Sequence, residues 1–260
     1  HHILCLNLAQ SQKMLYLCSM ERKVMAIGNI TPDSFYSGSR LSGGFEIVRW
    51  ARQAVVDGAS ILDIGGCSTR PGSAPIDSES EWARIEYALS AIREVMPDVS
   101  LSLDTFRPEI ARRALEEFGS MIINDVSGGC EKMYEIVQYW DVPYVWTLRG
   151  KLDLPSHYPE MNRLNLILDP GFGFTGGIEQ DYTCLREMHC LSQYGKPILV
   201  GISRKSMLYK PLDITPNECL NATQVAQFYA LTQGATILRT HDVKESVQTM
   251  KLYDLVVSKE

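Results

Sequence analysis

The chain has 260 residues, of which 45% are hydrophobic, and a formal net charge of −6, so it is long enough for one large α/β barrel or two small domains. The mild acidity argues against a nucleic-acid-binding protein, which would carry a basic face. We expect neither a membrane span nor a secretory signal, because no apolar run approaches ~20 residues and the first residues include no basic segment. The seven cysteines are scattered and lack a CxxC pair, which predicts reduced thiols in a cytoplasmic protein.

Eight short apolar runs recur along the chain, at 24–27, 60–64, 101–103, 121–126, 144–148, 164–168, 198–202 and 236–238. They are too short for helices and too uniformly apolar for half-exposed strands, so we interpret them as parallel strands buried on both faces. Amphipathic stretches between most of them predict helices, at 45–57, 82–96, 110–118, 131–140, 180–193, 217–233 and 244–256. Pro108 suits the start of the third of these helices. Eight strands alternating with helices predict a (β/α)₈ TIM barrel, of class α/β.

Two segments depart from the alternation of strands and helices. Residues 3–7 and 13–17 flank a polar turn, so residues 1–20 are predicted to form an N-terminal β-hairpin. Between Leu148 and Leu164 the chain has two prolines and no apolar stripe, which predicts a shortened or irregular fifth βα unit. Since no linker composition occurs, we expect a single domain over 1–260, with the barrel at 24–256.

Polar side chains follow each predicted strand. In a TIM barrel these positions meet at the carboxyl-terminal face, where the active sites of this fold are built. One group offers donors and acceptors for a polar heterocycle: Asp104, Asn124, Asp169 and Lys205. A second group suits an anion or its metal ion: Asn29, Arg70, Arg239 and His241. Asp63 is interpreted as a structural residue at the end of the second strand.

The strand ends lie in recognisable motifs: IGNITPDSF at 27–35, IGGCSTRPG at 64–72, LDT at 103–105, IINDVSGG at 122–129, LDPGFGF at 168–174, GISRKSM at 201–207 and RTHDV at 239–243. In this order they resemble the dihydropteroate synthase family from Val24 onward. Each motif alone is modest, but NxTPDSF, STRPG and SRKS together are highly specific. The resemblance implies an enzyme that condenses 6-hydroxymethyl-7,8-dihydropterin pyrophosphate with p-aminobenzoate to 7,8-dihydropteroate and pyrophosphate. It also implies Mg²⁺ as cofactor and a homodimer.

The resemblance further implies a role for each matching residue. The pterin ring is expected on Asp104, Asn124, Asp169, Lys205 and Arg239. The pyrophosphate is expected on Asn29, Thr69, Arg70, Arg239 and His241, and Asn29 is also the expected metal ligand. The p-aminobenzoate pocket is expected to include Thr69, Pro71, Phe174 and Ser206. Asp104, Lys205, Arg239 and His241 form the expected catalytic set.

Several positions differ from the family pattern. Cys67 stands where many members have Glu, Thr147 replaces a His at the end of the fifth strand, and Gly176 replaces a Lys after DPGFGF. These positions lie at the rim of the expected site, whereas its floor and its anion-binding residues match. Two alternatives therefore stay open beside the synthase: a catalytically impaired pterin-binding paralogue, and a pterin-dependent methyltransferase.

Overall fold

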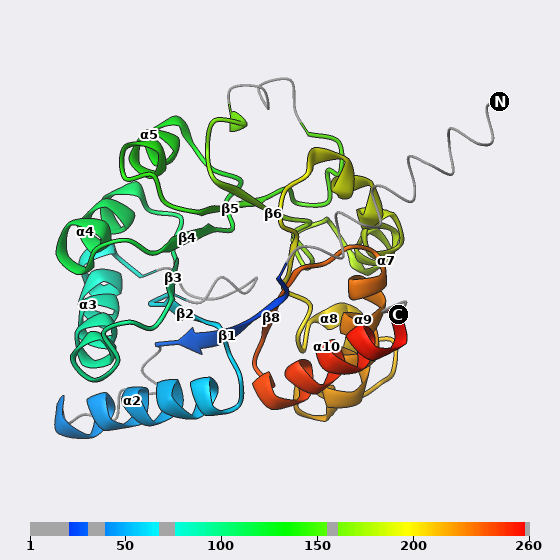
Figure 1. Cartoon of the computed structure of the whole chain (residues 1–260), viewed down its shortest axis with the longest axis horizontal. Coiled ribbons are helices and arrows are strands. Elements are labelled where there is room, and N and C mark those ends of the chain that lie inside the picture. The colour runs from blue at the N-terminus through cyan, green and yellow to red at the C-terminus, as the bar shows by residue number, and fades with distance from the viewer. Residues whose placement is uncertain (1–20, 31–39, 68–75, 155–160, 258–260) are drawn as a thin grey trace.

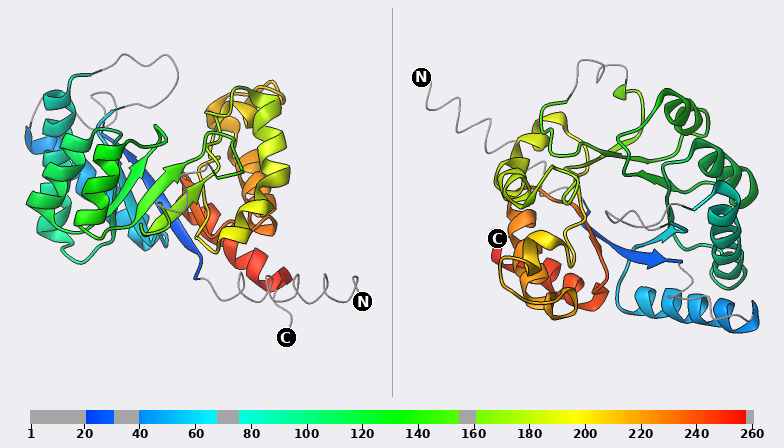
Figure 2. Two further views of the ribbon diagram at one scale, coloured as in Figure 1. Left: turned by 90° about the horizontal axis from the view of Figure 1, so that it is seen from above. Right: turned by 180° about the vertical axis from the view of Figure 1, so that it is seen from behind.

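The computed structural model describes residues 21–30, 40–67, 76–154 and 161–257. Its eight strands form one parallel sheet in the order β6-β5-β4-β3-β2-β1-β8-β7. A single parallel bridge between Leu168 and Ile198 joins β6 to the residues before β7 and closes the sheet into a barrel. Figures 1 and 2 show the strands at the centre with the helices around them. The predicted (β/α)₈ fold is confirmed.

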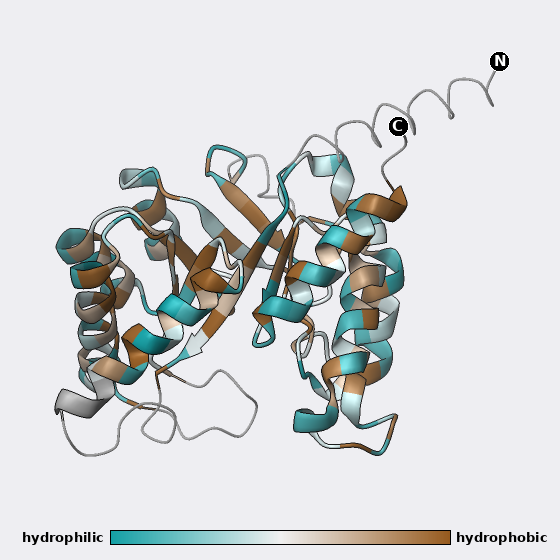
Figure 3. Cartoon of the chain, turned by 60° about the horizontal axis from the view of Figure 1, so that its bottom comes forward, coloured by the Kyte–Doolittle hydropathy of each residue, from teal (hydrophilic) through white to brown (hydrophobic). Residues whose placement is uncertain are grey.

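The strands match the eight predicted apolar runs to within a few residues: β1 (Lys23–Asn29), β2 (Ile61–Gly65), β3 (Leu101–Asp104), β4 (Ile122–Asp125), β5 (Tyr144–Thr147), β6 (Leu166–Asp169), β7 (Leu199–Val200) and β8 (Ile237–Thr240). All the pairings are parallel, and the register places Asn29 opposite Gly65 and Asp104 opposite Asn124. The hydropathy colouring of Figure 3 shows apolar strands enclosed by helices with mixed faces. Such burial on both faces explains the continuous apolar runs.

Helices follow the predicted amphipathic stretches: α2 (Arg40–Val56), α3 (Ser78–Val95), α4 (Pro108–Phe118), α5 (Glu131–Tyr139), α7 (Ile178–Glu187), α9 (Leu220–Thr232) and α10 (Val243–Val257). Pro108 is the first residue of α4, as predicted, because its missing N–H would have no partner there. The predicted helix at 180–193 is split, since a 3₁₀ helix, η1 (Met188–Tyr194), follows α7. The short helix α8 (Ser206–Tyr209) was not predicted, because it is about one turn long, and the predicted helix at 217–233 begins with a separate 3₁₀ turn, η2 (Pro216–Glu218).

The predicted N-terminal hairpin at 1–20 lies outside the described residues. The fifth βα unit is described at 148–154 and again from Met161, with residues 155–160 also outside. Its shortened or irregular form therefore stays a prediction. None of the described helices is long and apolar enough to cross a membrane.

The barrel encloses a small apolar cluster that is separate from the larger core between strands and helices. The cluster consists of Met25, Ile61, Val145, Ile167, Leu199 and Ile237, one residue from each of six strands. Because side chains alternate between the faces of a strand, the residues two positions further along point into the barrel as well. That second set lies closer to the carboxyl-terminal mouth, and it determines the chemistry there.

Candidate active site

The mouth of the barrel is lined by polar side chains that each lie two residues beyond an inward-facing position. They are Asp63 after Ile61, Asn124 after Ile122, Thr147 after Val145, Asp169 after Ile167 and Arg239 after Ile237. Asp104 follows buried Ser102 in the same way. The strand geometry therefore brings together the predicted pterin-binding residues of β3, β4, β6 and β8.

Arg239 lies at the centre of this group and joins two buried carboxylates. Its Nε donates to Asp63 Oδ2 at 2.6 Å, and its Nη2 donates to Asp104 Oδ2 at 2.6 Å. The side chain of Arg239 is 16% exposed, whereas those of Asp63 and Asp104 are 0% and 4% exposed. Two carboxylates so far from water are costly unless a cation is shared between them, and Arg239 provides it.

Asn124 completes the same network from β4. Its Nδ2 donates to Asp63 Oδ2 at 3.1 Å. Three oxygens of the network, Asp63 Oδ1, Asp104 Oδ1 and Asn124 Oδ1, are buried and have no hydrogen-bond partner among the described residues. A buried acceptor without a donor is unfavourable, so these oxygens, and above all the neighbouring Asp104 Oδ1 and Asn124 Oδ1 of β3 and β4, mark a position that a ligand with N–H donors would complete.

The electrostatics of the network affect Asp104 most. Burial raises the pKa of Asp104 to about 7; the Arg239 guanidinium opposes that rise, and the nearby Asp63 carboxylate adds to it. A carboxyl group with a pKa near neutrality changes its charge under ordinary conditions, which is a common property of functional sites.

Asp169 and Lys205 form a second charged group on the opposite side of the mouth. Asp169 Oδ1 accepts from the backbone N–H of Gly171 at 2.9 Å, and Asp169 Oδ2 accepts a long hydrogen bond of 3.5 Å from the Thr147 hydroxyl. Burial raises the pKa of Asp169, and the Lys205 ammonium partly opposes this rise. Burial lowers the pKa of Lys205 to about 8, and the Asp169 carboxylate opposes this fall.

Lys205 is held by the loop that follows β6. Its Nζ donates to the carbonyl oxygen of Phe172 and lies 5.3 Å from the centroid of the Phe174 ring. Phe174 is half-buried, and Ser206, the first residue of α8, directly follows Lys205. The two described members of the predicted p-aminobenzoate pocket, Phe174 and Ser206, therefore lie beside the predicted pterin ligand Lys205.

His241 lies just beyond β8 and contacts the loop after β7. Its Nδ1 is 3.1 Å from Ser203 Oγ, and its backbone N–H donates to the same oxygen at 3.3 Å. Arg204 donates to both carboxylate oxygens of Asp242. These contacts tie the ends of β7 and β8 together, so Arg204 serves to hold the loop.

Asn29 ends β1 and is half-buried beside β2. The other predicted anion and p-aminobenzoate residues, Thr69, Arg70 and Pro71, lie outside the described residues. Among the described residues no group of three or more His, Cys, Asp or Glu side chains is arranged to hold a metal ion. The predicted metal ligand, Asn29, offers one neutral amide oxygen.

Two of the described departures from the family pattern have clear surroundings. Thr147 is buried and hydrogen-bonds Asp169, so a hydroxyl occupies the expected place of an imidazole. Burial, and the Glu81 carboxylate after it, raise the pKa of the half-buried Cys67 thiol, which keeps this thiol protonated. Gly176 has a φ of +111° and is exposed, with open space where a Cβ would lie.

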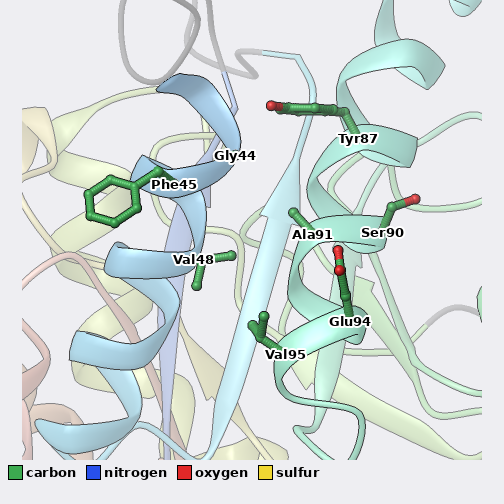
Figure 4. A pocket seen from close by; sticks show the side chains of 8 residues that line it. All are labelled: Gly44, Phe45, Val48, Tyr87, Ser90, Ala91, Glu94 and Val95. Carbon is green, nitrogen blue, oxygen red and sulfur yellow. The ribbon is translucent and has the colours of Figure 1, made fainter. Parts of the chain in front are cut away.

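An apolar groove lies elsewhere, on the outside of the barrel. It has a volume of about 390 Å³ and is lined by Gly44, Phe45 and Val48 of α2 and by Tyr87, Ser90, Ala91, Glu94 and Val95 of α3. Figure 4 shows these side chains on the two facing helices. None of the predicted site residues lines this groove, so it is separate from the barrel mouth.

Comparisons with known proteins agree with the class of enzyme that the barrel mouth defines. The family model described as "Pterin binding enzyme" matches residues 25–157 and 157–241. The dihydropteroate synthase of Escherichia coli K12 is 33% identical, over 90% of this chain and 92% of that protein. The Clostridium difficile enzyme, solved in the presence of pteroic acid, has a TM-score of 0.84 and 28% identity, covering 93% of this chain and 98% of its own.

The Xanthomonas albilineans dihydropteroate synthase solved with 4-aminobenzoic acid has a TM-score of 0.81 and 29% identity, covering 92% of this chain and 94% of that one. The chain therefore belongs to the dihydropteroate synthase family of pterin-binding enzymes, which are transferases of folate biosynthesis. The resemblance predicted from the motifs is confirmed.

Two residues of the site were not predicted as such. The sequence indicates only a structural role for Asp63 at the end of its strand, whereas the structure shows that it contacts Arg239 and Asn124. The alternation of side chains along β2 could have indicated this role, because it places Asp63 on the same inward face as Ile61. No sequence pattern indicates a role for Asp181 of α7, because acidic residues are common in the first turn of any helix. Its carboxylate binds the loop that holds Lys205.

Proposed function

We propose that the chain joins 6-hydroxymethyl-7,8-dihydropterin pyrophosphate to p-aminobenzoate and releases pyrophosphate. The observation that carries the proposal is the pair of unpartnered buried acceptors, Asp104 Oδ1 and Asn124 Oδ1, beside Arg239. The aminopyrimidine edge of a pterin presents N–H donors that match such acceptors. The C. difficile and X. albilineans structures, with pteroic acid and 4-aminobenzoic acid, support these substrate classes.

In this proposal the pterin ring lies across the mouth of the barrel. Asp104 and Asn124 accept hydrogen bonds from one edge of the ring, while Asp169 and Lys205 bind further polar atoms. Charged partners in a site with little water make these bonds strong and directional. The guanidinium plane of Arg239, held by Asp63 and Asp104, offers a flat surface for the ring.

The pyrophosphate group lies toward His241 and Asn29. The Ser203 hydroxyl accepts from the His241 backbone and can donate to Nδ1, which leaves the Nε2 proton for an anion. We assign Thr69 and Arg70 to the same anion from the family resemblance, and Thr69, Pro71, Phe174 and Ser206 to p-aminobenzoate. Phe174 and Ser206 lie next to Lys205, as that arrangement requires.

The reaction breaks the C–O bond between the pterin methylene and the pyrophosphate, and the electron pair leaves with the pyrophosphate. The cation that remains on the methylene is delocalised into the pterin ring, and the Asp104 and Asp169 carboxylates stabilise it. The aniline nitrogen of p-aminobenzoate then forms the C–N bond and afterwards loses a proton. Holding both substrates in one water-poor mouth makes this attack effectively intramolecular.

Asn29 is the residue that would hold Mg²⁺. Mg²⁺ binds oxygen ligands and usually keeps waters and substrate phosphates among them, so a single amide oxygen suits a metal that also contacts the pyrophosphate. When bound, the metal supplies positive charge to the leaving group.

Pyrophosphate release from purified protein tests the proposal directly. The reaction contains Mg²⁺ and the pterin pyrophosphate, with and without p-aminobenzoate, and the expected result is release that depends on p-aminobenzoate. Tight pterin binding without release would contradict a synthase and would identify a pterin-binding paralogue. Methyl transfer from a methylated pterin to a corrinoid, without pyrophosphate release, would identify the methyltransferase alternative.

We also propose a cytoplasmic homodimer that acts on small-molecule substrates. Helices α9 and α10 pack side by side and expose apolar side chains, among them Val225 at 64% and Leu255 at 80% exposure. Such side chains suit contact with a second copy of the chain across a twofold axis. Light scattering after size-exclusion chromatography tests this: a mass of one chain at micromolar concentration would contradict the dimer.

A further inference from the structure

Asp181 is a buried carboxylate that the proposed reaction does not use. It lies in the first turn of α7 and is 2% exposed. A buried carboxylate is costly unless it accepts hydrogen bonds or faces a cation, so its partners indicate its role. The N-terminus of a helix lowers that cost in part, because the helix dipole favours negative charge there.

The carboxylate of Asp181 binds the loop after β6. Its Oδ1 accepts from the backbone N–H of Gly173 at 2.8 Å and from the Thr175 hydroxyl at 2.7 Å. Gly173 has a φ of +81°, a conformation that L side chains rarely adopt. Glycine adopts this conformation without steric cost, and the two hydrogen bonds from Asp181 fix the loop in it.

The residues on either side of Gly173 are those that contact Lys205. The carbonyl oxygen of Phe172 accepts from Lys205 Nζ, and the Phe174 ring lies 5.3 Å from the same nitrogen. Gly173 itself is so close that a Cβ would lie 3.3 Å from Lys205 Cδ. Residues 172–174 therefore pack against the lysine, while Asp181 holds the same peptide through the Gly173 N–H.

We propose that Asp181 is a positioning residue for Lys205, acting through the loop at 172–175. The importance of Lys205 for the pterin rests on the proposed function, but the mechanical link rests on the contacts above. Asp181 also belongs to the set of charges around the lysine, together with Asp169, Arg239 and Asp104. It therefore acts in two ways, by hydrogen bonds to the loop and by its negative charge.

Two substitutions separate these two effects. Asp181→Asn keeps an oxygen acceptor for Gly173 and Thr175 but removes the charge. Asp181→Ala removes both the hydrogen bonds and the charge. Glu179→Gln is the matched control, because Glu179 is an exposed acid in the same first turn of α7. Should Asp181→Ala fail to fold, Thr175→Val removes one of the two hydrogen bonds from a half-buried position.

The first measurement needs no substrate. Lys205 is labelled with acetic anhydride between about pH 6 and pH 10, and its modification is followed by mass spectrometry, since only the neutral amine reacts and buried lysines shift their pKa readily. In Asp181→Asn we expect the labelling midpoint to fall by roughly half a pH unit, because one attractive charge is lost. In Asp181→Ala we expect the same fall and faster labelling. Glu179→Gln should match the unaltered protein.

The second measurement is calorimetric binding of the pterin pyrophosphate near neutral pH. We expect Asp181→Ala to weaken binding about tenfold and Asp181→Asn to restore it to within about threefold, because the asparagine retains the acceptor. Unchanged labelling of Lys205 in all variants would overturn the inference and leave Asp181 as a stabiliser of α7. Failure of the unaltered protein to bind the pterin would instead overturn the proposed function, and the labelling would still decide the role of Asp181.

Discussion

The two layers of side chains inside the barrel come from the same strands but differ completely in chemistry. The lower layer is apolar and includes Ile61, Ile167 and Ile237. Two residues further along the strands, the upper layer is polar and includes Asp63, Asp169 and Arg239, together with Asp104, Asn124 and Thr147. The lower layer closes the barrel by excluding water, whereas the upper layer is a network of charges that ligands complete.

The difference shows that the two-residue alternation of side chains along the strands provides both the stability of the barrel and its candidate site. Apolar side chains in the lower layer gain free energy from burial without needing specific partners. The upper layer has charges that would be costly at the same depth, and it is stable because Arg239 is shared between Asp63 and Asp104. Substitutions in the upper layer should therefore affect binding and catalysis, and also stability where they leave a buried carboxylate without its counter-charge. Substitutions in the lower layer should affect folding alone.

Asp104→Asn should have the largest effect on catalysis. We expect pyrophosphate release to fall roughly 10²–10³-fold, because a preorganised charge at the reacting group is lost. The melting temperature should stay close to its original value, since the pKa of Asp104 is already raised to about 7 by burial. Asp98→Asn, an exposed aspartate just before β3, is the control. Equal losses in both variants would contradict the role of the upper layer.

Arg239→Met should have the largest effect on stability. At neutral pH we expect a loss of about 3–5 kcal/mol in the free energy of unfolding, because buried carboxylates lose their counter-charge. Without Arg239 the folded-state pKa of Asp104 rises further above its unfolded value of about 3.9, so stability is lost as pH rises through that raised pKa. Urea unfolding at about pH 4 and pH 8 measures this, and the loss in the free energy of unfolding, relative to the unaltered protein, should be smaller at the lower pH.

An exposed ion pair gives the comparison for that variant. Arg49→Met breaks the surface pair with Glu46 and should cost less than about 1 kcal/mol at either pH. A deficit in Arg239→Met that does not change with pH would show that lost packing, and not uncompensated charge, causes it.

Ile237→Ala tests the lower layer, two residues before Arg239. Ile237 is 4% exposed, so we expect a loss of about 2–5 kcal/mol in the free energy of unfolding from the cavity that remains. The KM values for both substrates should not change at a temperature where the variant is folded. A raised KM for the pterin would mean that the two layers are not separable.

Pterin binding should depend on pH in a bell-shaped manner. Binding strengthens as Asp104 ionises with a pKa of about 7, and it weakens as Lys205 loses its proton with a pKa of about 8. Below the pKa of Asp104 and above the pKa of Lys205, the affinity for the pterin should fall up to about tenfold per pH unit. Calorimetric titration over this range measures both limbs. The acidic limb should disappear in Asp104→Asn, and its persistence there would assign it to another group.

Among the substitutions in the upper layer, Thr147→Val should have the smallest effect. The hydrogen bond from Thr147 to Asp169 is long, at 3.5 Å, and valine keeps the shape of the side chain. We expect binding of the pterin to weaken about threefold or less. Because that bond lowers the pKa of Asp169, its loss should raise this pKa further. A loss above tenfold would give Thr147 a direct role toward the ligand.

Much of this site could be predicted from the sequence, because it follows from strand alternation and strand ends. Asp104, Asn124, Asp169 and Arg239 each belong to a strand, and the barrel brings strand ends together whatever the loops do. Lys205 was predictable from the SRKS motif. The eight strands were predictable because burial on both faces leaves continuous apolar runs.

The remaining features depend on contacts between distant parts of the chain. No local pattern shows that Asp63 is shared by Arg239 and Asn124, or that Asp181 binds Gly173. The break between α7 and η1 also lacks a strong local signal, since the apolar residues Met188 and Leu191 continue the helical spacing. Such features depend on tertiary packing, which periodicity does not encode.

The pairing of Asp63 with Arg239 spans 176 residues, and this spacing has a consequence for synthesis on the ribosome. The chain emerges from its N-terminus, so β2 and β3 are complete long before β8 exists. During that interval the carboxylates of Asp63 and Asp104 lack the guanidinium that makes their burial tolerable. We therefore expect a nascent chain that ends before β8 to stay open at its centre, and co-translational folding to be completed only after the last strand has left the ribosome.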